Sequence, residues 1–176
     1  IWYKPMDDNY NFCYETKLPF KTMLRYNEMW DFEFTSDEIE KTKTDIIICH
    51  HKNDYMKYAV HYKNDSSNIF YYNPHHANSE IFKPLGTEKI YDVMISGVCK
   101  KKHYPLKYKL LQIIKKYKDT ELKDYNVHIH NHPGYRHNDS FKSLNQKKYN
   151  ELINKSKICL ACTSRHNYRL GKYVEI

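Results

Sequence analysis

The alternation of short apolar runs with helix-like stripes is the feature that most constrains the fold of this chain. Residues 45–50 form a short apolar run bounded by polar residues, which is typical of a buried parallel strand. The same pattern predicts further strands over 69–72, 90–96, 125–129 and 157–161. Helices are predicted from the capped start at 36–40, after Asn53, over 106–117, around Tyr149 to Lys155 and from Leu170. Strands that alternate with helices imply right-handed crossovers and an α/β fold with parallel, doubly wound sheets.

Residues 73–89 show little periodicity and contain the breakers Pro74, Pro84 and Gly86, so we interpret them as a linker between domains. One Rossmann-like domain then ends within 1–72 and a second begins within 90–176. Residues 1–44 are less regular. The chain opens in a strand-like run and stops inside a helix-like pattern, and we therefore expect a fragment of a longer protein.

Composition narrows the class of protein. The 176 residues are 40% hydrophobic, and none of the apolar runs approaches the roughly 18 residues that a membrane-spanning helix needs. The first residues do not have the order of a signal peptide. The five cysteines are an odd number, and three of them adjoin apolar runs. Reduced, buried thiols in a cytoplasmic protein without a transmembrane segment are therefore predicted.

The net charge of +8 raises the possibility of a nucleic-acid partner. The lysines are scattered among acidic residues, however, and the densest cluster is Lys100–Lys102. A positive loop also suits a small phosphorylated ligand. No nucleic-acid partner is expected, although a basic RNA-binding module stays open as an alternative.

Three predicted strands end in polar loops, and ligands of open parallel sheets bind beyond such carboxyl ends. In the first loop Gly97 lets a phosphate approach the backbone, while lysines and the helix after Pro105 supply charge and amide donors. In the third loop Arg165, Arg169 and Lys172 can clamp a diphosphate, and Glu175 can accept hydrogen bonds from ribose hydroxyls.

An ordered set of segments carries a resemblance that covers about residues 70 to 176. The set is Pro74-His75-His76-Ala77-Asn78, Ile81-Phe82-Lys83-Pro84, Tyr91-Asp92-Val93, Ser96-Gly97, Tyr104-Pro105-Leu106-Lys107, Asn154 to Leu160, and Lys172-Tyr173-Val174-Glu175-Ile176. It resembles the GT-B glycosyltransferases of the group 1, spore-maturation-protein CgeB-like kind. The resemblance implies two Rossmann-like domains with a cleft between them, of which this chain spans the end of the acceptor-side domain and the first half of the domain that binds the nucleotide-sugar.

The resemblance implies that a sugar is transferred from a nucleotide-sugar to an unknown glycan, protein or small-molecule acceptor, without a bound metal or other cofactor. Gly97 then faces the donor phosphates, Arg169 and Lys172 pair with the diphosphate, and Glu175 contacts the ribose. Two positions depart from the family pattern: Asn167 stands where a first glutamate is expected, and Lys107 stands where arginine is common. The catalytic residues stay unassigned, and the fragment alone is expected to be inactive.

Two further alternatives stay open. His130-Asn131-His132-Pro133 followed by Ser140 reproduces the spacing of zinc metalloproteases of the JAMM/RadC kind, in which two imidazoles hold a metal that activates water. That motif needs an aspartate where this chain has Ser143. The other alternative is a non-catalytic, degenerate glycosyltransferase module.

Overall fold

The computed structural model describes residues 2–3, 19–63, 68–131 and 145–176. The chain divides into two compact units, Ile1–Pro74 (unit 1) and His75–Ile176 (unit 2). Both units are mixed α/β structures built on small parallel sheets, so the predicted α/β class with parallel sheets is confirmed. Between β4 and β5, the last strand of unit 1 and the first of unit 2, the segment predicted as a linker contains no helix or strand.

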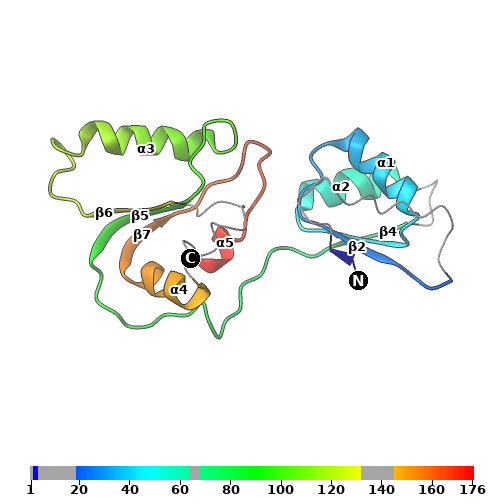
Figure 1. Ribbon diagram of the computed structural model, residues 1–176, viewed down its shortest axis with the longest axis horizontal. Helices are drawn as coiled ribbons and strands as arrows, with labels where there is room; N and C mark the ends of the chain where they lie inside the picture. Colours follow the sequence, from blue (N-terminus) through cyan, green and yellow to red (C-terminus); the bar gives the residue numbers. More distant parts are fainter. Residues whose placement is uncertain (1, 4–18, 64–67, 132–144) are drawn as a thin grey trace. The chain divides into compact units, whose positions relative to one another are not determined.

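The described part of unit 1 contains a sheet in the order β1-β2-β3-β4, all parallel, with two helices (Figure 1). Its elements are β1 (Trp2–Tyr3), β2 (Met23–Tyr26), α1 (Phe32–Thr42), β3 (Ile46–Cys49), α2 (Lys52–His61) and β4 (Ile69–Tyr72). The strands follow one another in a single direction across the sheet. Right-handed crossovers therefore place α1 and α2 on the same face, as Figure 1 shows.

The core of unit 1 lies between that face and the two helices. Leu24 and Tyr26 of β2 alternate inward, as do Ile47 and Cys49 of β3, and they pack with Ile39 of α1. From α2, Tyr58 is fully buried, and its hydroxyl donates to the carbonyl of Met29 at 3.1 Å. The inward-facing residues of the strands and the apolar faces of the helices thus pack into one hydrophobic cluster.

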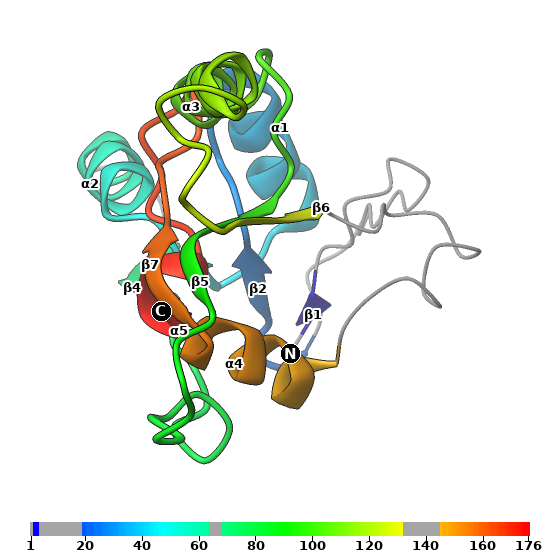
Figure 2. The same cartoon turned by 90° about the vertical axis from the view of Figure 1, so that its left-hand side faces the viewer.

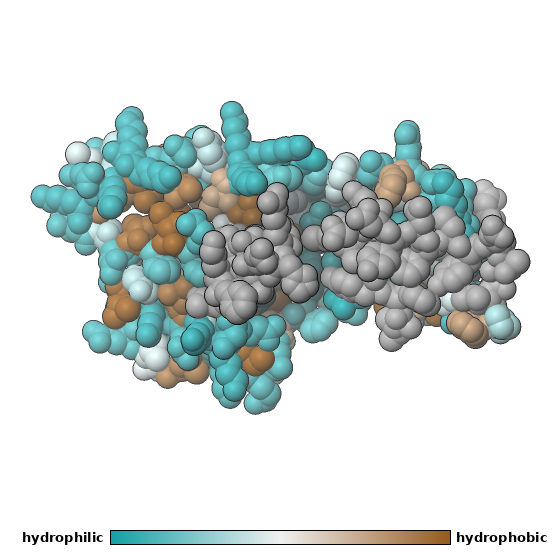
Figure 3. Space-filling model, viewed as in Figure 1, coloured by the Kyte–Doolittle hydropathy of each residue, from teal (hydrophilic) through white to brown (hydrophobic). Residues whose placement is uncertain are grey.

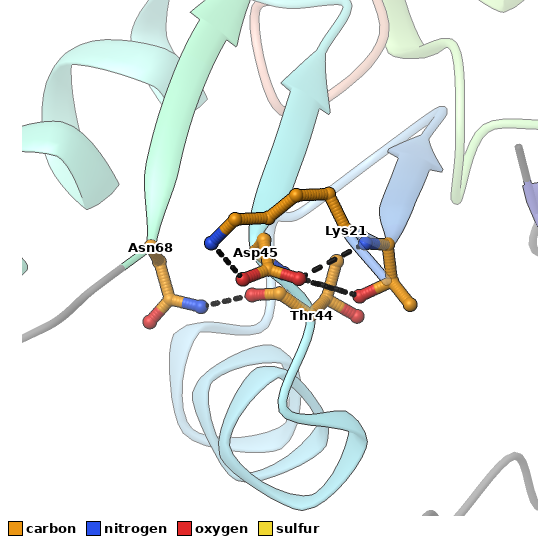
Figure 4. Close-up of polar contacts among 5 residues, drawn as sticks. Lys21, Thr44, Asp45 and Asn68 are labelled. Atoms are coloured by element: carbon orange, nitrogen blue, oxygen red, sulfur yellow. Dashed lines mark hydrogen bonds and ion pairs between the residues drawn. The ribbon is translucent and has the colours of Figure 1, made fainter. Parts of the chain in front are cut away.

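A buried aspartate fixes the amino ends of the strands of unit 1. The Asp45 carboxylate accepts hydrogen bonds from the backbone N–H of Thr22 at 2.9 Å and from the Lys21 ammonium at 2.8 Å (Figure 4). The Asn68 amide donates to the carbonyl of Thr44 beside it. These contacts tie together the starts of three neighbouring strands, which the sequence separates by more than twenty residues at each step.

Glu28 lies beyond the carboxyl end of β2. Burial raises the pKa of its carboxyl, and the nearby Asp54 carboxylate raises it further. A carboxyl whose pKa is higher in the folded state stabilises the fold below that pKa, and this contribution is lost as the pH rises through it. The charged form of the Glu28 carboxyl at neutral pH therefore lowers the free energy of unfolding.

We expect Glu28→Gln to raise the free energy of unfolding at pH 7 by about half a kcal/mol, a small effect because solvent screens a partly exposed charge. The gain should shrink as the pH is lowered toward 4, where wild-type Glu28 becomes protonated. Urea denaturation at several pH values measures it. Glu40→Gln, on the exposed side of α1, is the matched control. An equal gain in the control, or a gain independent of pH, would contradict the assignment.

The described part of unit 2 contains a parallel sheet in the order β6-β5-β7, with β5 in the centre. Its elements are β5 (Tyr91–Gly97), α3 (Pro105–Tyr117), β6 (Val127–Asn131), α4 (Gln146–Asn154), β7 (Ser156–Leu160) and α5 (Lys172–Glu175). The chain passes from β5 to β6 on one side and then crosses back to β7 on the other. The two crossovers run in opposite directions, so α3 covers one face and α4 the other (Figures 1 and 2).

Three details of the sequence prediction are wrong. The first helix begins at Phe32 rather than in the segment 36–40, because Asp31 is its N-cap and the Asp31 carboxylate accepts from the backbone N–H of Phe34. The strand β6 lies two residues later than predicted, and the final helix α5 is a single turn. None of the helices within the described residues is both long and apolar enough to cross a membrane.

Candidate functional site

The order of the strands in unit 2 distinguishes one position on its sheet, the carboxyl ends of β5 and β7. The direction of the chain reverses at β5, whose neighbours β6 and β7 are reached by crossovers on opposite faces. In open parallel sheets the crevice at such a reversal, beyond the carboxyl ends of the strands, is where ligands bind. For this sheet that position is at the ends of β5 and β7, where the loops that begin with Val98 and Ala161 leave the sheet.

Gly97 ends β5 with a φ of +86°, a backbone conformation that L-residues with side chains rarely adopt. A Cβ built on it would lie 3.8 Å from the Nζ atom of Lys107 and 3.8 Å from the Cε atom of Lys172. Within the described residues, no other atom outside its chain neighbours comes within 4 Å of that position. The glycine therefore keeps the backbone accessible between two lysine side chains that arrive from different helices.

Lys107 lies in the first turn of α3 and is only 5% exposed. Its ammonium donates to the carbonyl of Ser96 at 2.9 Å and lies 4.9 Å from the centre of the Tyr104 ring. Burial lowers the pKa of Lys107, and the charge of Lys172 lowers it further, while the thiols of Cys162 and Cys99 act in the opposite direction. Two neighbouring cations, one of them buried, form a site that an anion would stabilise.

Lys172 begins α5 and is held from two sides. Its ammonium lies 3.9 Å from the centre of the Tyr149 ring, a cation–π contact, and 3.4 Å from the Glu175 carboxylate. Tyr149 comes from α4, is buried, and shares a 2.7 Å hydrogen bond between its hydroxyl and that of Ser96. The side chain of Lys172 is therefore positioned by α4. This helix covers one face of the sheet, and α3, which carries Lys107, covers the other.

The loop after β7 adds positive charge. Its backbone is fixed to the loop after β5 by a 2.9 Å hydrogen bond from the N–H of Arg165 to the carbonyl of His103. The Nε atom of Arg165 donates to the His166 ring at 2.9 Å. Burial lowers the pKa of His166, and the neighbouring Arg165 guanidinium and the His103 ring lower it further. The carboxyl edge of β5 and β7 therefore has a positive potential that attracts anions.

The structure brings together some of the sequence-predicted residues. Gly97, Lys172 and Glu175 lie side by side, with Glu175 paired to Lys172 rather than standing alone. Arg165 and Arg169 are both exposed, and neither lies among the atoms within 4 Å of a side chain built at Gly97. Lys107, which the sequence analysis noted only as a departure from a family pattern, is the residue closest to the glycine together with Lys172.

The signal that could have pointed to Lys107 is its position. It is the third residue of a helix that begins at Pro105, shortly after the strand that ends in Gly97. A side chain in the first turn of such a helix points back over the end of the strand. The burial of Lys107 depends on tertiary packing and not on residue type. The other lysines of α3 are exposed on its outer side, where Figure 3 shows hydrophilic side chains over hydrophobic ones.

The histidines of the zinc alternative are only partly described. His130 is the fourth residue of β6, with its ring 6.3 Å from those of His128 and Tyr149. His132, Ser140 and Ser143 lie outside the described residues. Within the described part of the chain no three His, Cys, Asp or Glu side chains are grouped so that they could hold a metal ion. No observation on the described residues thus favours the metalloprotease.

Comparisons with protein-family models, with curated proteins and with solved structures found no match for this chain. The class of the molecule therefore rests on its own architecture: a mixed α/β arrangement of parallel strands with helices packed on them in each unit. The geometry of the site places two lysine ammonium groups beside the glycine that ends the central strand of unit 2.

Proposed function

We propose that this chain is part of a GT-B-like glycosyltransferase, and that unit 2 binds the diphosphate of its nucleotide-sugar donor beside Gly97. The observation that carries the proposal is the convergence of Lys107 and Lys172 on that glycine, at the reversal point of the sheet. The ordered set of sequence segments that resembles this enzyme family supports the same class. Unit 1 takes the acceptor-side role in this proposal.

The chemistry that the site supports is electrostatic. In sugar transfer the bond between the anomeric carbon and the donor phosphate breaks, a bond to an acceptor oxygen forms, and a nucleoside diphosphate leaves. Negative charge grows on the leaving phosphate, and fixed ammonium groups stabilise it. Lys107 and Lys172 are pre-positioned for this by the Ser96 carbonyl and the Tyr149 ring. The group that accepts the proton of the acceptor is not assigned.

Glu175 has a second role in this proposal. Its carboxylate already neutralises part of the charge of Lys172, with both side chains about 30% exposed. A ribose hydroxyl that donates to Glu175 would lie next to the diphosphate held by Lys172. This arrangement keeps the ribose contact that the sequence predicts and makes it adjacent to the lysine pair.

Isothermal titration with UDP and GDP tests the proposal on the 176-residue chain. We expect one nucleoside diphosphate to bind and uridine or guanosine, which lack phosphates, not to bind measurably. Lys172→Met should weaken binding about tenfold, the usual loss of about 1.4 kcal/mol when a charged hydrogen-bond donor is removed. Arg169→Met, at an exposed position three residues earlier, is the matched control and should change affinity less than threefold.

Circular dichroism must first show that both variants are folded. Absence of binding by UDP, GDP and inorganic pyrophosphate to the folded wild-type chain would refute the proposed donor site. Loss of affinity in Arg169→Met but not in Lys172→Met would instead assign diphosphate binding to the arginines of the loop after β7.

A further inference from the structure

Two cysteines lie at the same edge of the sheet in unit 2, on loops that leave neighbouring strands. Cys99 is two residues beyond the end of β5, and Cys162 is two residues beyond the end of β7. The register pairs Ile95 with Leu160, so Gly97 is level with Cys162 when the strands are continued. Adjacent strands are about 4.8 Å apart, so the two loops that carry the cysteines leave the sheet as close neighbours.

The Cys99 side chain turns back toward this level. Its thiol donates to the carbonyl of Gly97 at 3.6 Å, so the sulfur lies beside the residue that is level with Cys162. Cys162 is buried, 8% exposed, whereas Cys99 is partly exposed. Both thiols act on the same buried ammonium of Lys107 and on each other. The Cys99 sulfur and the Lys107 ammonium thus lie beside Gly97, and Cys162 stands level with Gly97 on the continuation of the neighbouring strand.

We propose that Cys99 and Cys162 form a reversible disulfide that links the loops after β5 and β7 when the chain meets a disulfide oxidant such as oxidised glutathione. In the first step the Cys99 thiolate attacks one sulfur of the oxidant, forms a mixed disulfide and releases one glutathione thiolate. In the second step the Cys162 thiolate attacks the sulfur of Cys99 and releases the second glutathione. The protein loses two electrons and two thiol protons, and the oxidant becomes two thiols.

The order of the two attacks follows from exposure, because an oxidant reaches the partly exposed Cys99 before the buried Cys162. Burial raises the pKa of the Cys99 thiol, and the Cys162 thiol also raises it, while the charges of Lys107 and Lys115 lower it. The thiolate is the attacking species, so bond formation should accelerate as the pH rises from 7 toward 9. This inference does not depend on the proposed donor site, because its test detects a covalent bond.

The experiment treats the 176-residue chain with a glutathione redox buffer at pH 8, blocks remaining thiols and digests the protein with trypsin. Cys99 falls in the peptide 90–100, where it is the single cysteine, and Cys162 falls in 158–165 together with Cys159. We expect a cross-link between these two peptides, with fragmentation placing the bond at Cys162. Cys159→Ser removes the ambiguity and should leave the cross-link intact, since Cys159 contacts the Ile153 carbonyl elsewhere on the sheet.

Denaturation provides the control for the folded arrangement. In concentrated urea the sequence neighbours Cys159 and Cys162 should pair instead, because the closer pair closes the smaller loop. In the native protein, a cross-link between the two peptides that survives Cys162→Ala would overturn the inference, because Cys159 would then be the partner of Cys99. Glutathione left on Cys99 without a bridge, or a native bridge from Cys159 to Cys162, would overturn it as well, and neither result requires a substituted chain.

Discussion

Alanine in place of Asp45 is expected to lower the free energy of unfolding of unit 1 by about 3 kcal/mol. The carboxylate is 2% exposed and accepts from the backbone N–H of Thr22 at 2.9 Å. Its removal leaves that buried N–H without an acceptor, which costs 1–3 kcal/mol in typical cases. The Thr22 hydroxyl, which donates to the same oxygen at 3.3 Å, loses its acceptor too.

The ion pair with Lys21 contributes less to this effect than the hydrogen bonds do. The Lys21 side chain is 76% exposed, so water solvates its ammonium in both states. We therefore expect Asp45→Asn, which keeps an acceptor for Thr22 but removes the charge, to cost only about 1 kcal/mol. The control is Asp37→Ala, which removes the exposed pair with Lys41 on α1 and should cost about 0.5 kcal/mol or less.

Urea denaturation followed by tryptophan fluorescence measures these changes selectively. The sequence holds two tryptophans, Trp2 and Trp30, and both belong to unit 1. An equal loss for Asp45→Ala and Asp37→Ala would show that the buried hydrogen bonds do not hold the strand starts together. A loss for Asp45→Asn as large as that for Asp45→Ala would assign the effect to the charge instead.

The longer elements of unit 2 were predictable because each of them has enough residues to show its pattern. The stripe in 106–117 has a helical repeat and appears as α3, and the apolar run 90–96 appears as β5. The stripe suits a helix that covers one face of a sheet, and the continuous apolar run suits the central strand of a parallel sheet. Local pattern and tertiary environment therefore agree there.

The strand β2 escaped prediction for a physical reason. Met23–Tyr26 is only four residues long and contains Arg25, whose Nε atom donates to the ring of His50. Its inward residues Leu24 and Tyr26 become recognisable as core only once β3 and α1 lie against them. The sequence Ser36-Asp37-Glu38 resembles a helix start, yet Ser36 is buried in the middle of α1. The N-cap is Asp31, and the aromatic residues of the first turn after it hid this start in the sequence pattern.

The candidate site, too, could be predicted only in part from the sequence. Gly97 and Lys172 follow from the ends of predicted elements, since strand ends and the loops after them carry ligands in such sheets. The contact of Lys172 with Tyr149 joins residues more than twenty positions apart in the sequence, and no spacing rule predicts it. The burial of Lys107 likewise results from packing and not from sequence neighbours.

Methionine in place of Lys107 is expected to weaken the binding of a nucleoside diphosphate about 30-fold or more, which corresponds to about 2 kcal/mol for a charge-assisted hydrogen bond. The ammonium is buried, and Lys172 is the second cation at the site. A bound phosphate would compensate both charges where little water competes, so this lysine should contribute more than the partly exposed Lys172.

The stability of unit 2 should change much less than its affinity. Lys107→Met leaves the Ser96 carbonyl without the ammonium donor, which costs stability, but it also removes the cost of burying a charge that its lowered pKa reflects. We expect these effects to offset each other to within about 1 kcal/mol, because replacing a buried charge with an apolar side chain of similar volume is often neutral.

The two readouts separate a ligand-binding lysine from a purely structural one. Titration calorimetry with the nucleoside diphosphate gives the affinity, and thermal unfolding followed by circular dichroism gives the stability. Lys109→Met, two residues along α3 and exposed, is the matched control and should change neither. A large loss of stability with unchanged affinity of the folded molecules would make Lys107 a structural residue, and Lys172 would then hold the phosphate without it.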